Sequence, residues 1–265
     1  QNLLKSSDRR SNASATKGNK RMVKKLLDTA KVSGNTKVAK TGKKGLPFGG
    51  KVRMAQLSMM PDSILCAGSK AAGCMDLCLK DAGLAAVYRS VNLARQARTD
   101  YWHQDREGFL SQLRRELTNF AKLCEKQNVK GVVRLNVLSD IAWEEHNIPQ
   151  DFPSLYFYDY TKRAKRLGKD KTPTNYDLMF SYSARHQYRK QVLMAVCQDN
   201  PIAVVFKSKM PDTFLGRDVI DGDQSDLTNV HAGKVIIGLK AKGPAKHDTS
   251  GFVVDANVVP TFTVS

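Results

Sequence analysis

Six short apolar segments, each running into polar residues, are the feature that most constrains the fold of this chain. They cover residues 132–140, 154–163, 176–185, 201–210, 217–226 and 234–243. Helical patterns precede and separate them, an alternation typical of an α/β fold with a parallel sheet. We therefore predict an irregular or partial (β/α) barrel, because the helices between the later segments are too short for eight complete units. An open doubly wound sheet is the alternative.

Two long helices are predicted ahead of these strands. Apolar residues recur at intervals of three and four through residues 84–104 and again through residues 107–127. Cys124 lies on the apolar stripe of the second pattern, and Cys197 lies in a later helical pattern, so we expect both outside any site. Residues 54–61 are predicted to form a short strand that leads into a cysteine-rich loop.

Three of the five cysteines lie within thirteen residues: Cys66, Cys74 and Cys78, with the spacing C-x7-C-x3-C. Converging thiolates make a strong site for soft metal ions and iron–sulfur clusters. We expect a [4Fe–4S] cluster, because three thiolates leave one iron open, as in enzymes that use S-adenosylmethionine for radical chemistry. S-adenosylmethionine is therefore a candidate cofactor, although those enzymes usually have C-x3-C-x2-C. The alternatives are zinc, with His103 as a fourth ligand, and three ordinary buried cysteines.

The charge is concentrated at the start of the chain. The whole sequence has 43 Lys and Arg against 25 Asp and Glu, and residues 1–53 hold fifteen basic and two acidic residues. We predict two regions, a basic arm over 1–53 and an α/β domain over 54–265, with a short basic helix over 21–32. A basic arm binds DNA or RNA by neutralising phosphates. The candidate nucleic-acid-binding residues are Arg21, Lys24, Lys25, Lys43, Lys44, Arg95 and Arg98.

Membrane association is not expected from this sequence. No secretory signal opens the chain, and no apolar run approaches the roughly 18 residues needed to span a bilayer. We therefore expect an intracellular, reducing location, in which clustered cysteines bind metal more often than they form disulfides.

Polar residues at the strand ends are the candidates for chemistry. Asp140, Asp159 and Lys162 are predicted to be catalytic, with either aspartate as a general base or a cation ligand. The predicted ligand-binding residues are Asn136, Ser139, Ser181, Lys207 and Lys240. Loop caps and salt bridges are the competing interpretation. Trp143 is expected in the core.

A run of acidic residues follows the fifth apolar segment. The spacing of Asp221, Asp223 and Asp226 resembles that of a cation-binding loop. The segment lacks the downstream glutamate of a calcium-binding EF-hand. A solvated turn is the preferred interpretation.

Six motifs together resemble one known family, the phage "gene product 88" domain family. They are CAGSKAAGCMDLC, SVNLARQARTDY, RLNVLSDIAWE, FYDYTKR, LMFSYSAR and GLKAKGPAKHDTSGFV, and they extend over roughly residues 45–260, which leaves the basic arm outside. The resemblance implies a phage or mobile-element origin, and hence a location in the infected host's cytoplasm or in the virion. It implies no mechanism.

Three functions are consistent with these features. The first is an iron–sulfur enzyme that modifies nucleic acid or a nucleotide, for which we expect radical chemistry. The second is a DNA- or RNA-binding virion or host-takeover protein with a structural metal, and the third is a metal-dependent nuclease. Walker-type nucleotide hydrolysis, zinc deamination and serine hydrolysis have no support, because their sequence motifs are absent.

Overall fold

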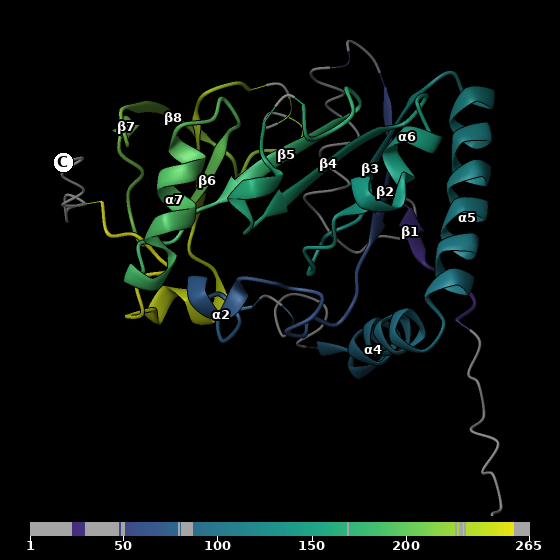
Figure 1. Ribbon diagram of the computed structural model, residues 1–265, viewed down its shortest axis with the longest axis horizontal. Coiled ribbons are helices and arrows are strands. Elements are labelled where there is room, and N and C mark those ends of the chain that lie inside the picture. Colours follow the sequence, from purple (N-terminus) through teal and green to yellow (C-terminus); the bar gives the residue numbers. More distant parts are fainter. Residues whose placement is uncertain are drawn as a thin grey trace, which may run out of the picture.

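The protein is built around one nine-stranded sheet (Figure 1). The computed structural model describes residues 23–29, 48, 51–78, 80, 87–168, 170–225, 227, 230 and 232–256. The strands, in chain order, are β1 (Leu27–Thr29), β2 (Val52–Leu57), β3 (Lys130–Arg134), β4 (Tyr156–Thr161), β5 (Tyr176–Ser181), β6 (Ile202–Phe206), β7 (Thr213–Phe214), β8 (Arg217–Asp221) and β9 (Ile236–Lys240).

The order across the sheet is β1-β2-β3-β4-β5-β6-β9-β8-β7. All pairings from β2 to β8 are parallel, whereas β1 and β7 pair antiparallel at the two edges. The predicted α/β class and the predicted parallel strands are therefore confirmed. The sheet is open, with β1 and β7 at its edges, and the described strands do not close into a barrel.

The helices are mostly short, apart from two. The α-helices are α2 (Ser69–Ala72), α4 (Arg89–Gln104), α5 (Arg106–Lys126), α6 (Ile148–Asp151) and α7 (Arg189–Val196). Single turns of 3₁₀-helix are η2 (Trp143–His146), η3 (Ala164–Arg166), η4 (His186–Tyr188) and η6 (Gly243–His247). The two long helices predicted from sequence correspond to α4 and α5.

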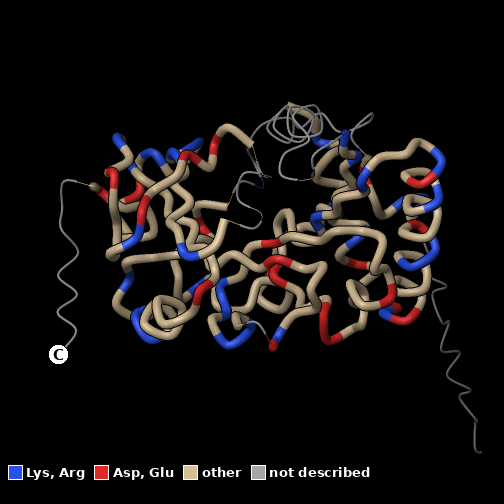
Figure 2. The backbone as a smooth tube through the Cα atoms, turned by 90° about the horizontal axis from the view of Figure 1, so that it is seen from above, with Lys and Arg blue, Asp and Glu red and all other residues tan. Residues whose placement is uncertain are grey.

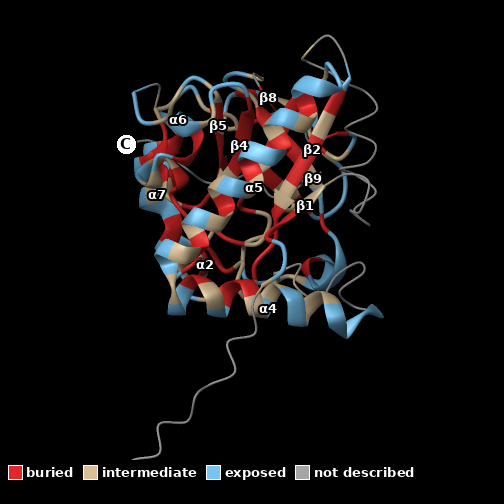
Figure 3. Cartoon of the chain, turned by 90° about the vertical axis from the view of Figure 1, so that its right-hand side faces the viewer, coloured by how far each residue is buried: buried red, intermediate tan, exposed pale blue. Residues whose placement is uncertain are grey.

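The sheet buries apolar side chains on both faces, because successive residues of a strand point to opposite sides. In β2, Ala55 and Leu57 belong to the main core, together with residues of α5, α6 and α7. Val52 and Met54 belong to a second, smaller core on the other face. Figure 3 shows the buried strands behind α5. Cys124 and Trp143 lie in the main core, as predicted.

The basic helix predicted over residues 21–32 is wrong for the part that the structure describes. Residues 27–29 form β1, which pairs with β2. Leu26 and Leu27 are buried, and their backbone N–H groups donate to the carboxylate of Glu116 on α5, at 2.8 to 3.1 Å. This tertiary contact provides the backbone donors with acceptors that a helix would provide internally. Tertiary structure therefore overrides the local helical pattern. The predicted boundary between the basic arm and the α/β domain, at residue 53, falls within β2.

Charge is mixed over the described body. Basic and acidic residues lie interspersed around the sheet and helices (Figure 2), in keeping with the modest excess of 28 basic over 23 acidic residues in positions 54–265. Within the described part of the chain, no helix is both long and apolar enough to cross a membrane.

Candidate functional site

The carboxyl ends of β2 to β5 lead into four segments that meet at one edge of the sheet. The cysteine loop follows β2, and hydrogen bonds connect it to the segments after the next strands. Asp140 N donates to Leu65 O at 2.7 Å, and Ser183 Oγ donates to Ala72 O at 2.7 Å. The loop is thereby fixed to the segments that follow β3 and β5, and its helix α2 lies below the sheet, next to the segment that follows β5 (Figure 1).

Glycines allow the cysteine loop to turn tightly. Gly68 and Gly73 bracket α2 and have positive φ angles of 91° and 78°, a region that other residues avoid. A Cβ at Gly73 would also lie 2.6 Å from Cδ of Arg185. The arginine side chain therefore lies directly over the backbone next to Cys74.

The three clustered cysteines influence one another in the folded protein. All three are partly buried free thiols. Burial raises the pKa of Cys66, and the neighbouring Cys78 and Cys74 raise this pKa further. Cys66 Sγ donates to Leu138 O at 3.2 Å, and Cys74 Sγ donates to Ser69 O at 3.7 Å. The three cysteines therefore lie in one neighbourhood, but among the described residues no three His, Cys, Asp or Glu form a group arranged to hold a metal ion, so the predicted metal site stays a prediction.

The other candidate ligands lie elsewhere or have partners. Cys124 is buried in the core and Cys197 is exposed. His103, the predicted fourth zinc ligand, has its Nε2 at 2.7 Å from Asp62 Oδ2. Burial by itself would raise the pKa of Asp62, but hydrogen bonds from Leu65 and His103 hold that pKa below its usual value. The negative charge of Asp62 in turn contributes to the raised pKa of Cys66.

Asn136 and Asp159 form a closed buried pair. Asp159 Oδ1 accepts from Asn136 N at 2.7 Å, and its Oδ2 accepts from Tyr176 OH at 3.0 Å. The Asn136 amide oxygen accepts three further bonds, from Ser139 Oγ, Ile141 N and Trp143 Nε1. Complete burial raises the pKa of Asp159 to about 7. We predicted that Asn136, Ser139 and Asp159 would contact a ligand. Instead, their polar side chains are used in these internal hydrogen bonds, which hold the ends of β3 and β4 together.

Asp140 is a buried ion-pair partner. Its Oδ1 accepts from Arg166 Nη1 at 2.6 Å, and its Oδ2 accepts from the backbone N of Lys162 at 2.9 Å. Arg166 also donates to both carboxylate oxygens of Glu144, at 2.7 and 2.8 Å. Burial raises the pKa of Asp140, although the charge of Arg166 opposes the rise.

Lys162 is buried at the end of β4. Its ammonium donates to Ser181 Oγ at 2.8 Å and to Ser181 O at 3.2 Å, beneath the ring of Phe252 at 4.5 Å. Burial lowers its pKa, and the negative charges of Cys74 and Asp140 act in the opposite direction. The structure thus brings the predicted residues Lys162 and Ser181 into contact, next to the cysteine loop.

The remaining predicted ligand-binding residues lie further along the sheet. Lys207 is exposed directly after β6, and Lys240 is exposed as the last residue of β9. Asp223 accepts from Lys240 N at 2.8 Å and pairs with Lys242 at 2.7 Å, whereas Asp221 accepts from Asp223 N at 2.9 Å. These contacts fit the preferred solvated turn, and Asp226 lies outside the described residues.

The predicted nucleic-acid-binding residues divide into three groups. Arg21, Lys43 and Lys44 lie outside the described residues. Lys24 and Lys25 are exposed beside β1, and Arg95 is partly buried, with Nη1 donating to Lys80 O at 2.8 Å. For Arg98 the prediction is wrong, because its side chain is only 8% exposed and pairs with Asp28 at 3.1 Å. Its guanidinium joins α4 to β1 and is not presented to solvent.

A family model for "Gene product 88" matches residues 14–256 of the chain. The chain belongs to this family. The resemblance stated from the six motifs is confirmed, and with it the phage character of the protein. The match begins at residue 14, so most of the basic arm is part of the family's domain and not outside it as predicted. No curated protein and no solved structure matches the chain.

Sequence reasoning missed the residues that organise this edge of the Gene product 88 domain. Arg163 and Arg166 follow β4, and Tyr176 and Arg185 belong to β5 and the segment after it. A signal for the first two was present: the run TKRAKR directly after an apolar strand places three basic residues beyond Lys162 at the predicted edge. Their partners, Glu144 and Asp140, lie 22 to 26 residues away and could not be assigned from the pattern.

Proposed function

We propose that this phage protein holds an iron–sulfur cluster through Cys66, Cys74 and Cys78 and acts as an enzyme on nucleic acid or a nucleotide. The observation that carries the proposal is the position of the three thiols. They lie in one partly buried loop at the carboxyl edge of a parallel sheet, where Cys78 and Cys74 help burial to raise the pKa of Cys66. Active sites of parallel α/β proteins form at this edge.

The donor set suits a cluster with one open iron. Three cysteines supply the thiolates, and the other two lie in the core or are exposed away from the loop. A [4Fe–4S] cluster bound in this way supplies an iron that can bind a small molecule such as S-adenosylmethionine. The Lys162 ammonium and the Arg95 guanidinium supply positive charge near Cys74 and Cys78.

The sheet is open, but its first part has the strand order of a partial barrel. Strands β2 to β6 are neighbours in chain order, and the order changes only after β6, which is followed across the sheet by β9, β8 and β7. Residues of α5, α6 and α7 all belong to the core on one face. In this arrangement the segments after β3, β4 and β5 surround the cysteine loop, and their buried polar pairs hold the loop's surroundings rigid for catalysis.

A structural zinc site is the second candidate. It is favoured by the Asp62–His103 pair, whose carboxylate lies within electrostatic reach of Cys66. Either side chain would complete four ligands with the three thiolates. In that case the protein is a nucleic-acid-binding virion or host-takeover protein without enzyme activity.

Nucleic acid is the proposed partner, in the infected host's cytoplasm or in the virion. The proposal rests on the excess of thirteen positive charges in residues 1–53 and on the exposure of Lys24 and Lys25. The nuclease alternative has less support from the geometry. Asp140 and Asp159 are buried against internal donors, whereas carboxylates that hold catalytic magnesium must face the substrate.

Metal analysis of anaerobically purified full-length protein tests the proposal. We expect a brown protein with iron and sulfide in equal amounts and a broad absorption band near ~400 nm. Replacing Cys66, Cys74 or Cys78 individually by alanine should remove the colour. Cys197→Ala, at an exposed thiol, is the matched control and should retain it. A colourless protein with stoichiometric zinc would instead establish the structural-metal alternative.

A further inference from the structure

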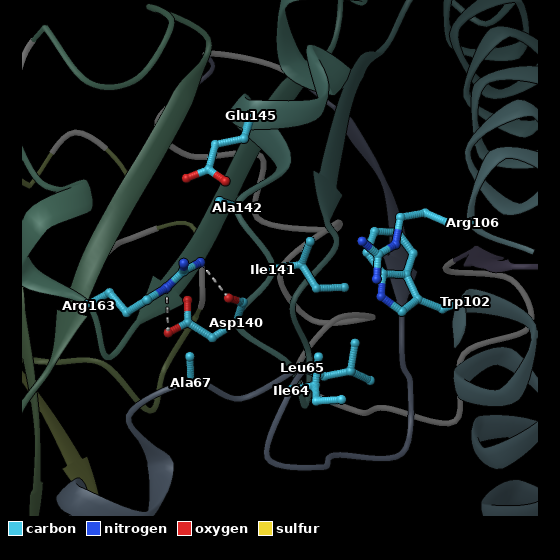
Figure 4. Close-up of a pocket in the computed structure, with 10 residues that line it drawn as sticks. All are labelled: Ile64, Leu65, Ala67, Trp102, Arg106, Asp140, Ile141, Ala142, Glu145 and Arg163. Atoms are coloured by element: carbon cyan, nitrogen blue, oxygen red, sulfur yellow. Dashed lines mark hydrogen bonds and ion pairs between the residues drawn. The ribbon is translucent and has the colours of Figure 1, made fainter. Parts of the chain in front are cut away.

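A pocket of about 160 Å³ opens beside Cys66. Leu65 and Ala67, the two neighbours of Cys66 in sequence, both line it. The other lining residues are Ile64, Trp102, Arg106, Asp140, Ile141, Ala142, Glu145 and Arg163. Figure 4 shows that these side chains come from the cysteine loop, the α4–α5 junction and the segments that follow β3 and β4.

Arg163 has donor capacity left over in this pocket. Its Nη2 donates to the backbone oxygen of Asp140 at 2.8 Å. Its Nε is buried and faces the carboxylate of Asp140, with which it forms an ion pair at 3.8 Å from Oδ2. Among the described residues Nη1 has no hydrogen-bond partner, so this nitrogen is the donor that remains for a bound molecule.

Asp140 engages only part of the Arg163 guanidinium. Its two oxygens accept hydrogen bonds from Arg166 Nη1 at 2.6 Å and from Lys162 N at 2.9 Å, and its ion pair with Arg163 is longer, at 3.8 Å. Arg166, which does not line the pocket, therefore supplies the closer charge compensation, and Arg163 can bind a second anion through Nη1.

Arg106 offers a second guanidinium across the pocket. Its Cζ lies 4.7 Å from the centre of the Trp102 ring, so the group is held over the indole. It is exposed, and within the described chain it has no hydrogen bond or ion pair. Arg106 and Arg163 lie on opposite sides of the pocket in Figure 4, with Ile141 and Leu65 between them.

We propose that this pocket binds the carboxylate or phosphate group of a small ligand, with Arg163 and Arg106 as its donors. A guanidinium group can donate two parallel N–H hydrogen bonds to a pair of oxygens of either anion. The volume is close to the ~150 Å³ of a cavity that accommodates benzene, so it fits one charged group and a small attached ring. Ile64, Leu65 and Ile141 give that attached part an apolar wall, and Glu145 at the exposed rim is screened by water.

This inference deepens the proposed function, because it places the ligand next to Cys66. A catalytic role of the pocket rests on that proposed function. The binding itself requires no metal. Its test is therefore made both on the protein as purified and on a full-length Cys74→Ser/Cys78→Ser variant, so that failure of the cluster proposal and failure of the pocket proposal are distinguished.

Calorimetric titration with three matched probes provides the test. Benzoate and phenyl phosphate carry the two anions on the same ring, and benzamide is the uncharged counterpart of benzoate. We expect benzoate or phenyl phosphate to bind at least tenfold more tightly than benzamide, and the tighter of the two identifies the natural anion. The same ranking should persist in the double cysteine variant.

Arginine variants decide whether the pocket is responsible. Arg163→Gln and Arg106→Gln should each weaken anion binding about tenfold, because each removes a charge-assisted interaction. Arg115→Gln removes an exposed charge from the same helix as Arg106 and should change affinity less than twofold. Arg106 is exposed, so its variant tests the proposal even if Arg163→Gln fails to fold. Equal binding of benzoate and benzamide, or unchanged affinity in Arg106→Gln, would overturn the proposal.

Discussion

Arg166 donates a hydrogen bond of 2.6 Å to Asp140, and both side chains are almost completely buried. Asp140 follows β3 and Arg166 follows β4, so the pair joins two adjacent strand ends beneath the cysteine loop. Because Arg166 also binds Glu144, one guanidinium compensates two carboxylates. A strand end is the usual place for a catalytic group. Because of this contact, Asp140 instead holds the strand ends around the site together.

Loss of Arg166 should be costly. In Arg166→Met the carboxylates of Asp140 and Glu144 remain buried without their partner, which is expected to reduce the free energy of unfolding by about 3–5 kcal/mol. Urea denaturation followed by circular dichroism measures the change. The exposed Arg115→Met substitution is the control and should cost less than about 0.5 kcal/mol. A similar small effect for both variants would show that the buried pair contributes little.

The buried Asp159 should make stability depend on pH. Its folded pKa is about 7, above the value of about 3.9 expected in the unfolded chain. Between these values the folded state holds a proton that the unfolded state has released, so stability falls as pH rises from about 4 to 7 and levels off above that. Unfolding free energies of wild type and Asp159→Asn, measured from pH 4 to 8, should therefore converge or cross as pH rises. A difference that is constant with pH would contradict the raised pKa.

Gly73 should be intolerant of a side chain. Gly73→Ala combines the strain of a positive φ, about 1–2 kcal/mol, with a clash of its Cβ against Arg185. Gly216→Ala is a matched control, because Gly216 also has a positive φ, of 69°, but open space where a Cβ would lie. We expect Gly73→Ala to be more destabilised by about 1–3 kcal/mol in thermal or urea unfolding. Equal destabilisation would mean that the Arg185 side chain simply moves aside.

Lys24 and Arg98 should behave differently in nucleic-acid binding. The double variant Lys24→Gln/Lys25→Gln is expected to lower the slope of log affinity against log salt by about 1–2, because each lysine that contacts phosphate releases a counterion. Fluorescence anisotropy with labelled DNA and RNA at several salt concentrations measures this slope.

Arg98→Gln is the informative comparison for that experiment. Its guanidinium is paired with Asp28 inside the fold, so the salt slope should stay unchanged while the free energy of unfolding falls by about 1–3 kcal/mol. A lower slope in Arg98→Gln, or an unchanged slope in the double lysine variant, would contradict the assignment.

Much of the framework followed from local patterns in the sequence. The alternation of apolar segments predicted the parallel strands β3 to β6, β8 and β9, and the stripe through 107–127 predicted α5 with Cys124 on its buried face. These features depend on the period of hydrophobic residues over a few turns or one strand, which is readable in a short window. The short spacing of Cys66, Cys74 and Cys78 similarly places all three in one loop, whereas the metal that they were predicted to bind stays a prediction.

Other features depended on partners that are distant in sequence. The Leu26–Leu27 segment has a helical pattern yet joins the sheet, because Glu116 on α5 accepts from its backbone. Arg98 was expected in solvent and is buried against Asp28, 70 residues earlier. Neither contact can be predicted from the local spacing of hydrophobic residues in the sequence.

The sequence by itself determined the order of strands and helices, the family and the residues that reach the carboxyl edge. The tertiary structure decided what those residues do there. Asn136, Asp140 and Asp159 bind buried partners 22 to 26 residues away, whereas Arg163 lines the pocket with only part of its guanidinium engaged by Asp140. The reason is that a buried polar group must be paired, and which partner is within reach depends on how the strand ends pack.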